Sequence, residues 1–190
     1  MDNTYKPIRN ASLQRAGPFN YGAGHVNPNV AGNPGLVYDL SVKDYYRFFC
    51  SLNYNSTQIN KITGKAFSCP ARQPNIHDLN YPSIMVPQLQ GFVTMKRKVK
   101  NVAEGHATYK AKVRSPPRVS VSVEPKQLEF YKKEEEKSFR VALRAMKNSS
   151  GNYVFESLIW KHAHYFFASP IVVNIVTINN FLITIQPIVV

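Results

Sequence analysis

Val93-Thr94-Met95-Lys96-Arg97-Lys98-Val99-Lys100 is the stretch that decides the fold. Its odd-numbered positions carry Val, Met, Arg and Val, whereas its even-numbered positions carry Thr and three lysines. Because successive side chains of a strand point to opposite faces, this period of two predicts a β-strand with one buried face and one basic, solvated face. Glu104-Gly105 then provides a turn.

The same alternation returns further along the chain. Apolar residues recur at every second position, or close to it, at Tyr109, Ala111 and Val113, at Val119, Val121 and Val123, at Phe139, Val141 and Leu143, and at Val154, Leu158 and Trp160. Short strands separated by turn signals are typical of two packed sheets. The sequence therefore predicts a mainly β protein with a β-sandwich over residues 78–173.

A helix is predicted over residues 41–52, before the strands. Ser41 is a good N-cap, and Asp44 follows it three positions later. Apolar side chains then recur at helical spacing at Tyr45, Phe48, Phe49 and Leu52. This stripe needs a core to pack against.

A second short helix is predicted from Asn55 to Ile62. Asn55 suits the N-cap, Gln58 stands three positions later, and Gly64 ends the helix. We expect Ile59 and Ile62 to face inward.

The remaining segments show no periodicity. Residues 1–17 are polar, which predicts a disordered tail, and residues 18–40 are rich in Gly and Pro, which predicts a rigid, non-repetitive path. Residues 65–78 contain two prolines and few apolar residues, as a linker does. Residues 174–190 form an atypical apolar tail that is too interrupted for a membrane span, and we expect read-through rather than a functional element.

The chain is strongly basic for its size, with a formal net charge of +13 in 190 residues. That length allows one domain with an appendage or two small domains. The charge raises nucleic acid, acidic polysaccharide or another anionic surface as partners. A solvated basic face is the favoured interpretation.

Cys50 and Cys69 are the two cysteines of the chain, too few for a four-ligand metal site, and no C-x-x-C occurs. A disulfide between them is favoured over a reactive and a structural thiol, because no base or redox motif flanks either residue. Sequons for N-glycosylation at Asn10, Asn55 and Asn148 indicate a secretory context. Residues 1–16 nevertheless lack the apolar core of a signal peptide.

Several motifs resemble, in this order, the C-terminal portion of plant subtilisin-like serine proteases. They are Gly22-Ala23-Gly24-His25-Val26-Asn27-Pro28, Pro34-Gly35-Leu36-Val37-Tyr38-Asp39, Asp44-Tyr45 with Phe48-Phe49-Cys50, Asn53-Tyr54-Asn55, Cys69-Pro70, Leu79-Asn80-Tyr81-Pro82-Ser83, Lys100-Asn101-Val102, Val119-Ser120-Val121-Ser122-Val123-Glu124-Pro125, Glu136-Lys137-Ser138-Phe139 and Ser169-Pro170-Ile171-Val172-Val173.

This resemblance implies what each part of the chain is. Residues 18–75 would be a loop-and-helix remnant of an α/β subtilisin catalytic domain, and residues 78–173 a fibronectin type III-like domain. The stripe on the first helix would pack on the catalytic domain and would be left partly exposed in this chain. The resemblance further implies an extracellular, apoplastic protein. It also implies that this chain is a truncated product, whose missing upstream part carried the signal peptide and the catalytic residues.

The chain departs from the family near its last strands. Trp160-Lys161-His162-Ala163 stands where the family has Trp-Ser-Asp-Gly, and Ala168-Ser169-Pro170 where it has Arg-Ser-Pro. Losing Asp-Gly removes favourable turn residues, so the final β-hairpin is in doubt.

Candidate catalytic and binding residues give weak signals. His25 could act as a base, but it lies in none of the family's catalytic motifs, and a loop histidine is the favoured interpretation. His162 and His164 could share one strand face as metal ligands, yet no third ligand is identifiable. Gly22-Ala23-Gly24 lacks the third glycine of a dinucleotide-binding loop. Lys96, Lys98 and Lys100 are better explained by a solvated strand than by a nucleic-acid patch.

The sequence therefore predicts a non-catalytic supporting region of a subtilisin-like serine endopeptidase, without cofactor, metal, nucleic acid or membrane span. The alternative is an independent extracellular module that binds acidic surfaces such as cell-wall polysaccharide.

Overall fold

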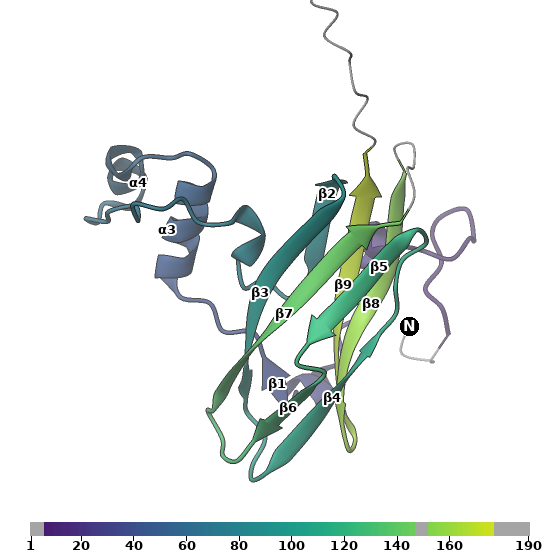
Figure 1. Ribbon diagram of the computed structural model, residues 1–190. Helices are drawn as coiled ribbons and strands as arrows, with labels where there is room; N and C mark the ends of the chain where they lie inside the picture. The colour runs from purple at the N-terminus through teal and green to yellow at the C-terminus, as the bar shows by residue number, and fades with distance from the viewer. Residues whose placement is uncertain (1–5, 147–151, 177–190) are drawn as a thin grey trace, which may run out of the picture.

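A computed structural model describes residues 6–146 and 152–176 as a two-layer β-sandwich with a helix pair beside it (Figure 1). This confirms the mainly β class and the short helices before it. The strands are β1 (Leu36–Val37), β2 (Ile84–Leu89), β3 (Phe92–Asn101), β4 (Ala107–Val113), β5 (Val119–Glu124), β6 (Gln127–Phe130), β7 (Glu136–Ala145), β8 (Tyr153–His162) and β9 (Tyr165–Ile175). The helices are α1 (Pro18–Tyr21), α2 (Pro28–Ala31), α3 (Val42–Ser51), α4 (Ser56–Thr63) and the 3-10 helix η1 (Ile76–Asp78).

The two sheets differ in the number of strands and in strand direction. One has the order β1-β3-β7-β5 and the other the order β2-β9-β8-β4-β6. All pairs are antiparallel except β2 with β9, where Ile84 stands opposite Ile171 and Val86 opposite Val173. The core between the sheets is aromatic and aliphatic, with Trp160, Tyr109, Phe130, Phe139, Leu143 and Leu158 fully buried.

Strand β3 follows the predicted pattern. Met95 and Val99 are buried in the core, Arg97 is buried between them, and Lys96 and Lys98 are exposed. It pairs with β7 over nearly its whole length, from Phe92 to Lys100.

Strands β2 and β6 were not predicted. Pro87 lies within β2, where it withholds a backbone donor, and β2 is accordingly an edge strand. Strand β6 has four residues, too few for a period of two to stand out.

The doubt about the final hairpin was wrong. Strands β8 and β9 pair from Tyr153 opposite Asn174 to His162 opposite Tyr165. The turn forms without Asp-Gly because Ala163 takes the required positive φ of 46°. Long ladders on both sides hold that strained residue in place.

The N-terminal residues are not a disordered tail where the structure describes them. Residues 8–16 form a small hairpin in which Ala16 donates its N–H to Ile8 O at 2.9 Å. The Asn10 Oδ1 atom accepts the N–H groups of Ser12 and Gln14, each at 3.0 Å, and this fixes the turn. The ring of Phe19 in α1 then packs edge-on against Tyr153 and Phe155 of β8.

The two sheets also include residues on either side of the predicted range 78–173. Residues 18–40 are not wholly irregular: they form α1, α2 and β1, and β1 pairs with β3, so Leu36 lies in the sandwich core. At the other end β9 continues to Ile175, which is buried opposite Leu89. Residues 177–190 of the predicted apolar tail lie outside the described residues.

Candidate functional site

Helix α3 is the main exposed apolar element outside the sandwich. Its N-terminus is fixed as predicted, because the Asp44 carboxylate accepts hydrogen bonds from the Ser41 N–H (2.8 Å) and Oγ (2.7 Å). Partial burial raises the pKa of Asp44, but these bonds and nearby Arg47 outweigh it, so the pKa lies below its ordinary value. The carboxylate therefore stays charged and caps the helix.

Helix α4 is capped on the same plan. Asn55 donates its N–H to Gln58 Oε1 and accepts the Gln58 N–H on its own Oδ1, both at 2.9 Å, and Gly64 ends the helix with a φ of 66°. Ile59 is fully buried as expected. The expectation for Ile62 was wrong, since this residue is 60% exposed.

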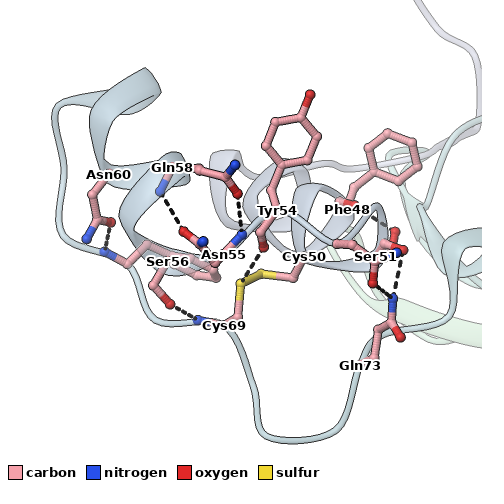
Figure 2. The surroundings of a disulfide bond; sticks show 12 residues. Phe48, Cys50, Ser51, Tyr54, Asn55, Ser56, Gln58, Asn60, Cys69 and Gln73 are labelled. Atoms are coloured by element: carbon pink, nitrogen blue, oxygen red, sulfur yellow. Dashed lines mark hydrogen bonds between the residues drawn. A yellow bond between two sulfur atoms is a disulfide. The ribbon is translucent and has the colours of Figure 1, made fainter.

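A disulfide between Cys50 and Cys69 joins the end of α3 to the segment that follows α4 (Figure 2). The segment after α4 is also hydrogen-bonded to the helix pair at two residues. Cys69 N–H donates to Ser56 Oγ at 3.0 Å, and the Gln73 amide donates to Ser51 O at 3.1 Å. The predicted linker is therefore folded back along the helix pair rather than extended.

One side of α3 carries an apolar stripe, which we define as Val42, Tyr45, Phe49 and Leu52. It keeps three residues of the predicted stripe, adds the exposed Val42 and leaves out Phe48. These positions follow helical spacing and so share one face. Tyr45 is 44% exposed and Leu52 is 40% exposed, while Phe49 is half-buried against Tyr54, with the two ring centroids 5.5 Å apart. The predicted partial exposure of this helix is thus observed.

The helix pair is braced to the free edge of β3 by residues 75–80. Strand β1 covers β3 only at residues 100–101, so the backbone groups of residues 94–98 need other partners. Lys96 N–H donates to Asp78 Oδ1 at 2.8 Å, and Lys98 N–H donates to Asn80 Oδ1 at 2.7 Å. Asn75 and Asn80 donate their side-chain amides to the carbonyls of Thr94 (3.2 Å) and Lys98 (2.8 Å).

A second brace precedes α3 and consists of residues 35–39. Gly35, with a φ of 77°, approaches so closely that a Cβ there would lie 2.6 Å from Tyr109 Oη. Tyr38 Oη lies 3.0 Å from Ser169 Oγ, and Asp39 forms an ion pair with Lys100. The hydrogen bond from Lys100 holds the pKa of Asp39 below its ordinary value, and the same bond raises the pKa of Lys100.

Arg97 occupies the junction of these braces. Its Nη1 donates to His77 O at 2.6 Å and to Lys96 O at 2.8 Å. Burial lowers the pKa of Arg97 and also that of His77, whose pKa is lowered further by the neighbouring guanidinium. Sequence reasoning did not predict any brace residue, although the spacing of Asp78 and Asn80 suits two successive outward N–H groups of a strand edge.

The other candidate residues are dispersed. His25 is exposed between α1 and α2. His162 Nδ1 lies 3.0 Å from Thr108 O, and among the described residues no group of three or more His, Cys, Asp or Glu side chains gathers as a metal site. Asn10 and Asn55 both use Oδ1 in local turns, whereas Asn148 lies outside the described residues.

Comparison with known families identifies the family of the sandwich. Residues 78–173 match the family described as fibronectin type-III domain. The chain belongs to this family. The fibronectin type-III domain here also receives β1 from upstream and extends β9 beyond the matched residues.

The chain is also homologous to the C-terminal region of plant subtilisin-like proteases. It is 47% identical to subtilisin-like protease SBT5.3 of Arabidopsis thaliana, over 92% of this chain and 23% of that protein. It is 45% identical to SBT5.4 of the same plant, over 92% and 22%, and 39% identical to subtilisin-like serine-protease S of Lotus japonicus, over 93% and 24%. The chain thus spans about a quarter of the length of these relatives. Among the described residues, no helix is both long and apolar enough to cross a membrane.

Proposed function

We propose that this region is the non-catalytic support of a subtilisin-like serine endopeptidase. Its fibronectin type-III domain holds the helix pair, and the apolar stripe of α3 packs against a catalytic domain. The observation that carries this proposal is the stripe itself: it stays partly exposed on a helix that is capped, disulfide-bonded and braced to β3. A surface that is both apolar and rigid is typical of an interface.

The proposal is tested in a chimaera in which this chain replaces the matching C-terminal region of SBT5.3. Tyr45→Lys with Phe49→Lys should lower the melting temperature of the catalytic domain and its yield of casein-cleaving enzyme, because charges would be buried in the interface. Met85→Lys with Phe166→Lys places the same charges on exposed positions of β2 and β9. Equal losses from both double variants, or none from the stripe variant, would contradict the proposal.

The absence of catalysis is tested on the chain alone. Because none of the family's catalytic motifs is present, a fluorophosphonate probe should not label the purified chain. Stoichiometric labelling of one serine that is lost on heating would overturn this assignment.

We further propose an extracellular location with glycans on Asn10, Asn55 and Asn148. At Asn10 and Asn55 the described hydrogen bonds use Oδ1, which leaves the Nδ2 atom open for a glycan. Treatment of the plant-secreted protein with a peptide N-glycosidase should convert the occupied asparagines to aspartates, detectable by mass spectrometry. Unmodified asparagine at all three positions would contradict this.

A second candidate function is binding of acidic polysaccharide by the domain. It is favoured by one observation: among the described residues, Lys96, Arg140 and Arg144 are exposed on one sheet without an ion pair.

A further inference from the structure

The outer face of the four-stranded sheet carries a polar, basic strip, which we call the trough and define as Thr94, Lys96, Ser122, Arg140, Ala142 and Arg144. Its residues stand in register across three strands. Thr94 and Ser122 flank Ala142, so two hydroxyl groups lie on either side of a small side chain. Arg140 and Arg144 stand on β7 to either side of Ala142, and Lys96 is directly opposite Arg140. The trough therefore has a hydroxyl-lined floor with a guanidinium at each end.

The cations of the trough form no ion pair among the described residues, unlike the lysines further along β3. Lys98 pairs with Glu136 at 2.8 Å, and Lys100 pairs with Asp39. Within the part of the chain that the structure describes, no such carboxylate engages Lys96, Arg140 or Arg144.

Each end of the trough has one further neighbour. Glu124 stands in register with Arg140 without forming an ion pair with it. The Arg144 guanidinium lies 5.3 Å from the ring centroid of Phe92, which holds it over the sheet.

The surface is hollowed at the end of the trough that contains Lys96 and Arg140. This depression has a volume of about 570 Å³ and is lined by Lys96, Glu124, Pro125, Ser138, Phe139 and Arg140. Two cations, the Ser138 hydroxyl and the Glu124 carboxylate thus line one depression, and the cations outnumber the carboxylate. A carboxylate there could accept bonds from a planar guanidinium and from an ammonium.

We propose that the trough binds a polyuronate, an acidic polysaccharide with a carboxylate on each sugar. The chain lies along β7, with one carboxylate between Lys96 and Arg140 and a second at Arg144. Four residues of strand separate the two arginines, about 13 Å, which is the length of a few sugar units. This inference rests on the second candidate function and names its site.

The side chains favour a polysaccharide over other acidic partners. Single-stranded nucleic acid is bound by aromatic side chains on which bases stack, and the exposed aromatic ring beside the trough, Phe92, is engaged by Arg144. A protein partner would need a buried apolar anchor, and the floor offers only Ala142. Hydroxyl groups and arginines suit a chain of hydroxyl and carboxylate groups.

The test uses the full chain and an oligogalacturonate, with the methyl-esterified form of the same length as a neutral control. Calorimetric titration at low salt should show saturable binding of the acid and none of the ester. Arg140→Gln with Arg144→Gln should weaken binding at least about tenfold, because two charge-assisted contacts are lost. Lys110→Gln with Lys112→Gln removes the same charge from exposed positions of β4 and should leave binding within about twofold.

The outcomes separate the site from the function. If both double variants weaken binding equally, the domain binds acidic polysaccharide, but the trough is not the site. If the unaltered chain does not bind the oligogalacturonate, the site and the second candidate function both fail. If an oligodeoxythymidylate binds as tightly and depends equally on Arg140 and Arg144, the choice of polysaccharide is overturned.

Discussion

The side-chain amide of Asn80 satisfies both backbone groups of Lys98. Its Nδ2 donates to Lys98 O at 2.8 Å, and its Oδ1 accepts the Lys98 N–H at 2.7 Å. The amide thus supplies the two bonds that a neighbouring strand would make at this point of β3. The same Nδ2 also donates to Asp39 O at 3.2 Å, so one side chain connects both braces of the helix pair.

Replacement of Asn80 should weaken this connection. Asn80→Ala removes the partners of one N–H and two carbonyl groups, so the free energy of unfolding should fall by about 1–2 kcal/mol in urea denaturation. Asn80→Asp keeps the acceptor and loses the donor, so its effect should be smaller. Gln90→Ala, which removes an exposed amide, serves as control. An equal denaturation midpoint for Asn80→Ala and this control would disprove the role of Asn80.

Gly35 should tolerate no side chain. Gly35→Ala puts a Cβ 2.6 Å from Tyr109 Oη and 2.7 Å from the Tyr165 ring at a φ of 77°, and we expect a loss of at least about 3 kcal/mol. Gly91→Ala is the matched control, because Gly91 has a φ of 71° with nothing within 4 Å of the added atom, and should lose only about 1 kcal/mol. Similar losses in urea for the two variants would show that β1 is not tightly docked.

The final turn should be improved by glycine. Ala163→Gly relieves the positive φ of 46° and should raise the melting temperature, with a gain of up to about 1 kcal/mol. Ala168→Gly, within β9, should instead destabilise the protein, because glycine weakens a strand. A lower melting temperature for Ala163→Gly would contradict the strain at this turn.

Tyr109 should limit stability at high pH. Burial raises its pKa from the ordinary value of 10 to about 12, so the folded protein keeps the hydroxyl neutral while the unfolded chain ionises. Its contribution is complete below pH 10 and is lost as the pH rises towards 12, about 2 kcal/mol in all.

Tyr109→Phe should remove this part of the alkaline loss. At neutral pH the variant should be at least as stable as the unaltered protein, because the buried Oη has no hydrogen-bond partner among the described residues. Tyr131→Phe, at an exposed position, is the control. Denaturation midpoints measured in steps across this pH range should fall more steeply for the unaltered protein and the control than for Tyr109→Phe. An equally steep fall with pH in Tyr109→Phe would refute the assignment.

Reduction of the disulfide should loosen the helix pair. The bond closes a loop with a sequence separation of 19, for which the chain-entropy estimate is about 3 kcal/mol. Dithiothreitol should therefore accelerate proteolysis after Lys61 and Lys65 while the sandwich stays protected, and the oxidised protein should weigh two hydrogens less. Free alkylation of Cys50 and Cys69 without reductant would rule out the pair.

Local rules predicted the parts of the fold that depend on neighbouring residues. The caps at Ser41 and Asn55 and the alternation in β3 are as expected, because each is decided within a few positions of the chain. The two residues of β1 give no periodicity, so their place in the core was not predicted. The same holds for Asp78 and Asn80, whose partners lie 18 residues away on an edge that only the assembled sheet defines.

The parallel pairing of β2 with β9 bears on the order in which the chain can fold. Among the described strands, β2 pairs only with β9, although it is synthesised before most of the domain and β9 is synthesised last. Antiparallel neighbours such as β8 and β9 form through short turns, but closing the loop from β2 to β9 carries a larger entropic cost. During translation β2 therefore cannot complete its pairing with β9 until residue 175 has left the ribosome. Until then β2 is an unpaired apolar edge, and such edges favour aggregation of a nascent chain.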